Sequence, residues 1–137
     1  MVMTKEEYAA QGKKNRRIGA KFERDTRKDM EDKGWIVDKW SNNVDLDSEE
    51  IVKAKLPFSG GYARVIGTGF PDFVIFHLEF EDNYKLIFVE CKINGKLSKT
   101  EKLKMNFLIK QGHNCFVAYK DGKEISYKEF LGYEDKS

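Results

Sequence analysis

The sequence from Gly69 to Lys92, GFPDFVIFHLEFEDNYKLIFVECK, contains two runs of apolar, β-branched and aromatic residues separated by the polar residues 81–83. Two such runs around a short polar break predict a β-hairpin. If the chain reverses near this break, Asp72 lies opposite residues 90–92. Ionisable groups from both strands would then meet at one end of an otherwise hydrophobic hairpin.

The charged residues at this end have the chemistry of a cation site. Side chains alternate between the faces of a strand, so Glu90 and Lys92 share one face and Cys91 lies on the other. Two nearby carboxylates, Asp72 and Glu90, repel each other unless something positive lies between them. Such a donor set suits Mg²⁺, which keeps several waters and binds phosphate oxygens. Lys92 would orient or deprotonate an attacking water, or offset charge on a phosphate.

Pro71-Asp72 and Glu90-Cys91-Lys92 resemble the Pro-Asp…(Asp/Glu)-X-Lys signature of the PD-(D/E)XK nuclease superfamily. The resemblance implies that Asp72, Glu90 and the main-chain carbonyl of Cys91 bind Mg²⁺ or Mn²⁺. It also implies that Lys92 positions the attacking water while the Cys91 thiol faces the core.

Two further segments extend the resemblance to residues 12–120. Gly19 to Arg24, GAKFER, is similar to the first helix of VRR-NUC nucleases and archaeal Holliday junction resolvases, in which a Glu assists the metal site. Glu23 matches that position and would steady a metal-bound water or a second ion. Gly95 to Glu101 resembles a Leu-Ser-X-X-Gln segment, although Glu101 stands where the Gln is expected. The resemblance implies a restriction-endonuclease-like αβββαβ core, a small mixed sheet flanked by helices.

Each candidate residue also has a purely structural interpretation. Asp72 after Pro71 is compatible with a turn before a strand, and Glu90 with Lys92 could be an exposed ion pair. Glu23 could be an ordinary carboxylate on a helix surface. However, residues 86–89 are expected to be buried on both faces, which makes an adjoining Glu-Cys-Lys costly without a function.

The charge distribution is more informative than the net charge of +2. Residues 12–28 are rich in Lys and Arg and residues 92–110 are rich in Lys, and both segments flank the proposed site. Such basic segments suit a phosphate backbone and imply salt-dependent binding, although they could instead be two solvated helix faces. The predicted nucleic-acid contacts are Lys13, Lys14, Arg16, Arg17, Arg24, Tyr62, Arg64, Lys96 and Lys99.

The remaining pattern alternates helices and strands within a single domain, 1–137. Residues 1–11 show little pattern beyond a possible cap at Thr4, and Ser98 or Thr100 is expected to cap the second helix, with Leu103, Phe107 and Leu108 on its inward face. The predicted elements are a helix over 16–33 with Ile18, Phe22 and Met30 on its apolar stripe, a strand over 35–40, a loop or hairpin insertion over 41–68, a helix ending near 111, a strand over 114–119, and a short strand with a final helical turn over 124–130.

Composition excludes several other classes. Hydrophobic residues make up 40% and charged residues 35%, with no apolar run long enough to cross a membrane and no signal peptide, so we expect a cytoplasmic protein. Cys91 and Cys115 lack CxxC spacing and are expected to be buried thiols. His77 and His113 are far apart in the sequence, so zinc is not indicated.

The leading hypothesis is a Mg²⁺-dependent endonuclease that hydrolyses DNA, with selectivity for a junction, flap or single-stranded end and action as a homodimer. A sequence-specific restriction or homing endonuclease, in which residues 41–68 read bases, is the alternative within enzymes. A nucleic-acid-binding module that keeps the fold without cleaving and a protein-interaction domain without any nucleic-acid role are the alternatives outside them.

Overall fold

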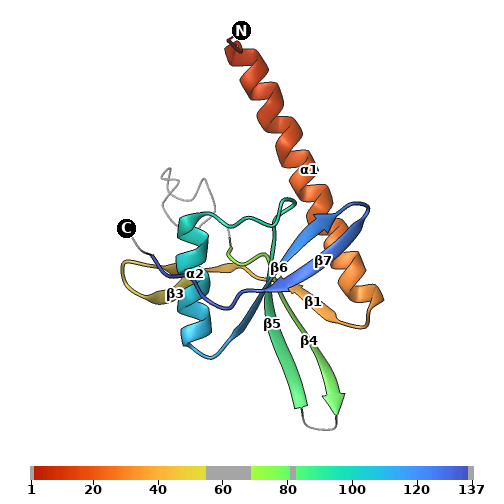
Figure 1. Cartoon of the computed structure of the whole chain (residues 1–137), viewed down its shortest axis with the longest axis vertical. Helices are drawn as coiled ribbons and strands as arrows, with labels where there is room; N and C mark the ends of the chain where they lie inside the picture. The colour runs from red at the N-terminus through yellow and green to blue at the C-terminus, as the bar shows by residue number, and fades with distance from the viewer. Residues whose placement is uncertain (1, 55–68, 81–82, 136–137) are drawn as a thin grey trace.

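The chain has a mixed α/β fold, seen in a computed structural model that describes residues 2–54, 69–80 and 83–135 (Figure 1). Strands β1, β4, β5, β6 and β7 form one sheet in that order, and β2 pairs with β3 in a separate two-stranded sheet. The elements are α1 (Lys5–Asp32), β1 (Ile36–Lys39), β2 (Asn42–Asp45), β3 (Glu50–Lys53), β4 (Phe73–Phe80), β5 (Asn83–Cys91), α2 (Lys99–Lys110), β6 (Asn114–Asp121) and β7 (Glu124–Glu129). Without the β2–β3 hairpin and β7, the order is the predicted αβββαβ.

The predicted central hairpin is confirmed. Strands β4 and β5 are antiparallel, with Phe73 opposite Val89 and Ile75 opposite Ile87. Strand β6 then pairs parallel to β5 after the α2 crossover, as a parallel pair requires. The sheet is therefore mixed, and β5 lies at its centre.

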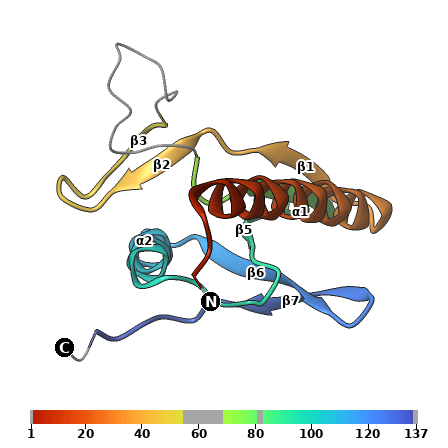
Figure 2. The same cartoon turned by 90° about the horizontal axis from the view of Figure 1, so that it is seen from above.

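The two helices cover opposite faces of this sheet (Figure 2). Met30 of α1 packs against Ile75, Ile87 and Val89, whereas Met105 and Leu108 of α2 pack against Phe88 and Val117. Because neighbouring β5 residues alternate between the two clusters, residues 87–89 are buried on both sides. Leu86 was expected to be buried as well, but it is 43% exposed.

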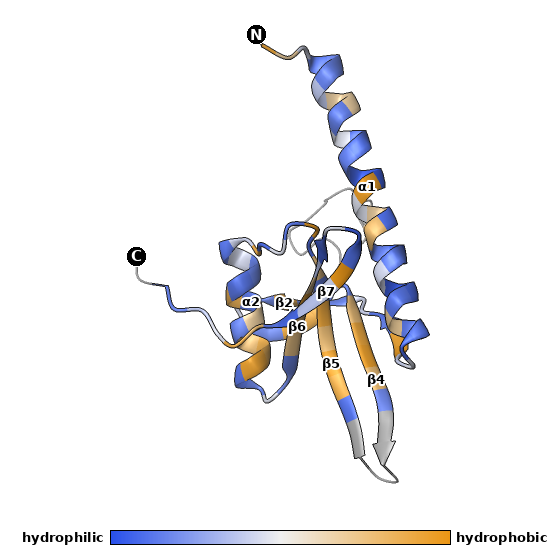
Figure 3. Cartoon of the chain, turned by 45° about the vertical axis from the view of Figure 1, so that its right-hand side comes forward, coloured by the Kyte–Doolittle hydropathy of each residue, from blue (hydrophilic) through white to orange (hydrophobic). Residues whose placement is uncertain are grey.

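Helix α1 begins earlier than predicted. It starts at Lys5, where the Thr4 Oγ1 accepts a hydrogen bond from the Glu7 N–H at 3.1 Å. Its N-terminal half projects beyond the sheet (Figure 1) and is largely hydrophilic (Figure 3). A helix can be recognised from the spacing of its apolar residues only where one face packs on a core. Ile18, which we assigned to the apolar stripe, is exposed. Within the described residues, no helix is long and apolar enough to cross a membrane.

Helix α2 begins with the predicted cap. Ser98 is the N-cap and forms a capping box with Glu101. The expected inward face needs a correction, because Met105 and Leu108 are the buried pair and Leu103 is only half-buried. The half-buried Phe107 packs beside the core cluster, as expected.

The insertion and the C-terminal end agree with the prediction in part. Strands β2 and β3 form a hairpin within 41–68, while Tyr62 and Arg64 lie outside the described residues. Strand β7 is present, but the prediction of a helical turn near residue 130 is wrong. The Phe130 N–H instead donates to the Cys115 carbonyl at 2.8 Å and holds the chain extended along the sheet.

The revised inward face of α2 predicts that two apolar residues of this helix, Met105 and Leu103, contribute differently to stability. Met105→Ala should lower the free energy of unfolding by about 2–5 kcal/mol, because Met105 is fully buried. Leu103→Ala, on the same helix, should cost clearly less. Urea denaturation of both variants checks this, and an equal or larger loss for Leu103→Ala would contradict the assigned face.

Candidate active site

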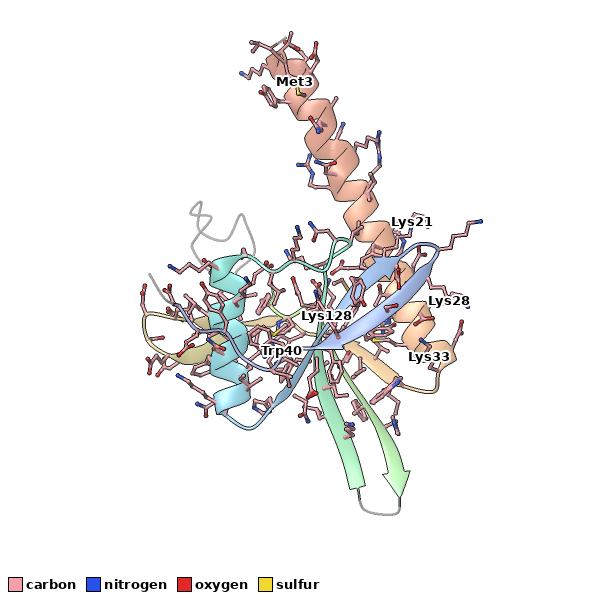
Figure 4. The ribbon with its side chains drawn as sticks, in the orientation of Figure 1. Met3, Lys21, Lys28, Lys33, Trp40 and Lys128 are labelled. Atoms are coloured by element: carbon pink, nitrogen blue, oxygen red, sulfur yellow. The ribbon has the colours of Figure 1, made fainter. Side chains whose placement is uncertain are left out.

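The backbone around Asp72 is held from both sides before β4 begins. The Phe70 N–H donates to the Asn42 carbonyl at 2.8 Å, and the Asp72 carbonyl accepts from the Trp40 N–H at 3.0 Å. Pro71 is fully buried, and Trp40 lies between α2 and the central strands (Figure 4). The position of Asp72 is thus set by the core rather than by a free loop.

Asp72 and the end of β5 exchange hydrogen bonds. The Asp72 N–H donates to Glu90 Oε1 at 3.1 Å, and the Cys91 N–H donates to Asp72 Oδ2 at 2.8 Å. The two carboxyl groups also interact directly with each other. The predicted meeting of Asp72 with residues 90–92 is confirmed.

Burial makes this carboxyl pair expensive to ionise. The Glu90 side chain is 7% exposed, and burial followed by the charge of Asp72 raises the pKa of Glu90 strongly. Burial, then the neighbouring carboxyl of Glu23, raises the pKa of Asp72, although the Cys91 N–H partly opposes this shift. Such a pair is stabilised by a shared proton or by a cation between the carboxylates.

Glu23 reaches the same place from a different element. It lies one turn before the buried Thr26 on α1, and its carboxyl interacts with that of Asp72. Lys39 of β1 donates to both Glu23 oxygens, at 3.2 and 3.5 Å. The three carboxylates that the sequence nominated are therefore linked through Asp72, which interacts with both Glu23 and Glu90.

Lys92 lies beside this group as a cation. Its Nζ is 2.7 Å from Glu101 Oε2 and 3.9 Å from Glu90 Oε2. Partial burial lowers the pKa of Lys92, but the hydrogen bond and charge of Glu101 outweigh it, so the pKa is raised overall. An ammonium group of this kind orients water or offsets negative charge, and it is a poor base at neutral pH.

The thiol and the main-chain carbonyl of Cys91 lie in different environments. The thiol packs with the α1-side core next to the Thr26 hydroxyl, and burial raises its pKa. Its N–H points to Asp72, whereas the Lys92 N–H points to Ala118 of β6. Because the N–H and C=O of one strand residue face the same side, the Cys91 carbonyl faces the Asp72 side. Cys115 is a buried free thiol, as expected, whereas Cys91 was expected to be buried too and is only half-buried.

The donor set fits a cation that keeps much of its water. Across the described ranges 2–54, 69–80 and 83–135, no three or more His, Cys, Asp or Glu side chains form a ready metal-binding group. Asp72, Glu90 and the Cys91 carbonyl offer hard oxygen donors that would fill only one side of a cation's coordination shell. Incomplete oxygen sets of this kind suit Mg²⁺ rather than zinc.

The predicted nucleic-acid contacts fall into separate groups. Lys13, Lys14, Arg16 and Arg17 lie on the projecting half of α1, and Arg24 is exposed one residue after Glu23. Lys96 is exposed on the loop before α2. Lys99 forms an ion pair with Asp135 at 3.0 Å, so part of its charge is already neutralised.

Sequence reasoning missed several neighbours of the site. Lys39 pairs with Glu23 across 16 positions, and Lys104 donates to the buried Asn43 at 2.9 Å across 61 positions. Burial lowers the pKa of Lys104. The contact between Glu101 and Lys92 was also not foreseen. No periodicity or motif connects the residues of these pairs, because each pair depends on how a helix packs beside the strands.

No family model matches this chain, and no curated protein or solved structure matches it either. Its function must therefore be inferred from the site itself.

The buried carboxyl pair predicts an unusual effect of Glu90→Gln on stability. The amide keeps an acceptor for the Asp72 N–H and cannot ionise, whereas Glu90 must either bury a charge or take up a proton on folding. Without metal at about pH 8 the variant should therefore melt a few degrees higher than wild type. Because burial and the charge of Asp72 raise the folded-state pKa of Glu90, wild type keeps its full stability below about pH 4 and loses it as pH rises toward that folded-state pKa.

Thermal melts in EDTA from acid to mildly alkaline pH measure this difference, which should vanish toward low pH. Added Mg²⁺ should stabilise the wild type more than the variant, because binding to the folded state alone shifts the unfolding equilibrium. A variant that is less stable than wild type at every pH would show that Glu90 is not under charge strain.

Proposed function

We propose that this chain is a metal-dependent endonuclease of the PD-(D/E)XK type that hydrolyses DNA. The observation that carries the proposal is the Asp72–Glu90 pair, in which Glu90 is buried and Asp72 half-buried, each carboxyl accepts a main-chain N–H, and the Lys92 ammonium lies beside them. The αβββαβ order and the contact of Glu23 with Asp72 support it.

Each residue of the site has a role in this proposal. Asp72, Glu90 and the Cys91 carbonyl would hold Mg²⁺ or Mn²⁺, which when bound lowers the pKa of a coordinated water and offsets phosphate charge. Lys92 donates a hydrogen bond that orients the attacking water or a phosphate oxygen. Glu23 would accept a hydrogen bond from a water molecule bound to the metal ion.

The projecting half of α1 supports binding to a polyanion. Among the described residues, its basic side chains form no ion pair with an acidic side chain, whereas Lys21, Lys28 and Lys33 near the sheet each pair with an Asp four residues away. Lys13 and Arg17 are themselves four residues apart, and like charges at that spacing weaken a helix. Phosphate groups along a nucleic acid would relieve this repulsion.

The β2–β3 hairpin does not favour reading of bases. A two-stranded ribbon fits the major groove, but the tip of this hairpin, formed by its turn and the adjoining strand ends, carries Asp45, Asp47, Glu49 and Glu50, which would repel phosphates. We therefore infer that the enzyme selects DNA by structure, such as a junction, flap or single-stranded end.

Cleavage assays test the proposed activity directly. Wild type should cut labelled DNA only with Mg²⁺ or Mn²⁺, and Asp72→Asn, Glu90→Gln and Lys92→Met should each abolish cutting while leaving DNA binding largely intact. Single-stranded, duplex, flap and four-way-junction substrates, with EDTA as the control, give the substrate preference.

Fixed ends on linear duplex would favour a restriction or homing endonuclease over structure selection. Metal-independent cutting, or cutting that survives all three substitutions, would contradict the site. Intact binding without any cleavage would favour a non-catalytic DNA-binding module, and absence of binding would favour a protein-interaction role.

The α1 residues predict a distinct effect of salt on binding. Lys13→Gln/Arg17→Gln should weaken DNA binding and reduce the slope of log affinity against log salt by about 2, because each phosphate contact releases about one counterion. Fluorescence anisotropy over a salt series measures this slope.

The matched control is Lys21→Gln/Lys28→Gln, on the same helix. These two lysines are exposed on α1 (Figure 4) and are already paired with Asp25 and Asp32, at 2.7 Å each. This variant should leave the slope nearly unchanged. Equal losses for the two variants would show that charge in general, rather than the projecting segment, determines binding.

A further inference from the structure

The Glu101 carboxylate is held between two donors at the start of α2. Its Oε1 accepts the Ser98 N–H at 2.8 Å, and its Oε2 lies 2.7 Å from Lys92 Nζ. The Glu101 N–H in turn donates to Ser98 Oγ at 3.1 Å. The side chain is 19% exposed and therefore has little freedom to move away.

This arrangement fixes the distance between Lys92 and Glu90. The Lys92 ammonium is 2.7 Å from Glu101 but 3.9 Å from Glu90 Oε2, which is too far for a hydrogen bond. The other Glu90 oxygen accepts the Asp72 N–H. Lys92 is thus close enough to act at the site without occupying the oxygen that a cation would need.

We propose that Glu101 is a positioning residue, which holds Lys92 beside the Asp72–Glu90 pair and prevents it from closing onto Glu90. The inference rests on the proposed function, because it assigns Lys92 and Glu90 their roles there. Without the Glu101 contact, Lys92 is free to form a direct ion pair with Glu90 and to compete with the metal ion.

The chemistry of the two donors explains why a carboxylate suits this position. The Ser98 N–H and the Lys92 ammonium both need an acceptor, and each Glu101 oxygen serves one of them. A glutamine offers one oxygen and one NH₂ group, so it satisfies one donor and turns a donor toward the other. Glu101→Gln is therefore a conservative substitution that specifically loosens Lys92.

A metal-binding cycle separates positioning from helix capping. Mn²⁺ binding to the full chain is measured by the electron paramagnetic resonance signal of the free ion, for wild type, Glu101→Gln, Lys92→Met and the double variant. Glu101→Gln should weaken Mn²⁺ binding about tenfold, in the range typical for partners of metal ligands. In the Lys92→Met background the same substitution should have no effect, because no ammonium remains to compete.

Ser98→Ala is the matched control for the cap. It removes the acceptor for the Glu101 N–H but leaves Lys92 in contact with Glu101, so it should lower the melting temperature without changing Mn²⁺ affinity. In cleavage assays Glu101→Gln should reduce kcat and leave KM for DNA nearly unchanged.

The outcomes distinguish this inference from the proposed function. Equal losses of Mn²⁺ affinity from Glu101→Gln with and without Lys92, or no loss in either background, would overturn the positioning role. A wild type that binds Mn²⁺ at the pair but cleaves no DNA would contradict the endonuclease and leave the positioning result valid. A wild type that binds no Mn²⁺ would overturn both.

Discussion

The exchange of hydrogen bonds between Asp72 and the end of β5 is the constraint on which the site depends. It requires the antiparallel register in which Phe73 faces Val89, since a shift by one residue would turn Glu90 to the other face of the sheet. That register is fixed by the buried residues on both faces of β5. The same packing that stabilises the sheet therefore forces two carboxyl groups together, at a cost that a proton or a cation offsets.

The elements around this pair each contribute one charge. Helix α1 brings Glu23 to Asp72, and β1 brings Lys39 to Glu23. Helix α2 begins at the capping box whose Glu101 holds Lys92. The two helices thus act on the site through single side chains, while the bulk of each helix packs on a different face of the sheet. Lys39 and Lys92 offset only part of the repulsion, because burial and the neighbouring carboxyl groups still raise the pKa values of Asp72 and Glu90.

The sequence was sufficient for the centre of the fold and for the residues nearest the site. The β4–β5 hairpin could be predicted because its apolar runs and polar break are local features, and the position of Asp72 opposite Glu90 followed from it. The start of α1 at Lys5 could not, because a helix in solvent has no core-facing period. The choice of Met105 over Leu103 depends on how α2 rotates against the sheet. The interaction of Lys92 with Glu101 likewise depends on a crossover that local patterns do not describe.

The central claim is that Asp72 and Glu90 bind one divalent cation together. Anomalous diffraction from crystals soaked in Mn²⁺ tests it most directly, because the position of the ion is then observed rather than inferred. We expect a single peak at coordination distance, about 2.0–2.2 Å, from oxygens of Asp72 and Glu90, on the side faced by the Cys91 carbonyl. A peak elsewhere, or an intact carboxyl pair with no peak at saturating Mn²⁺, would contradict it.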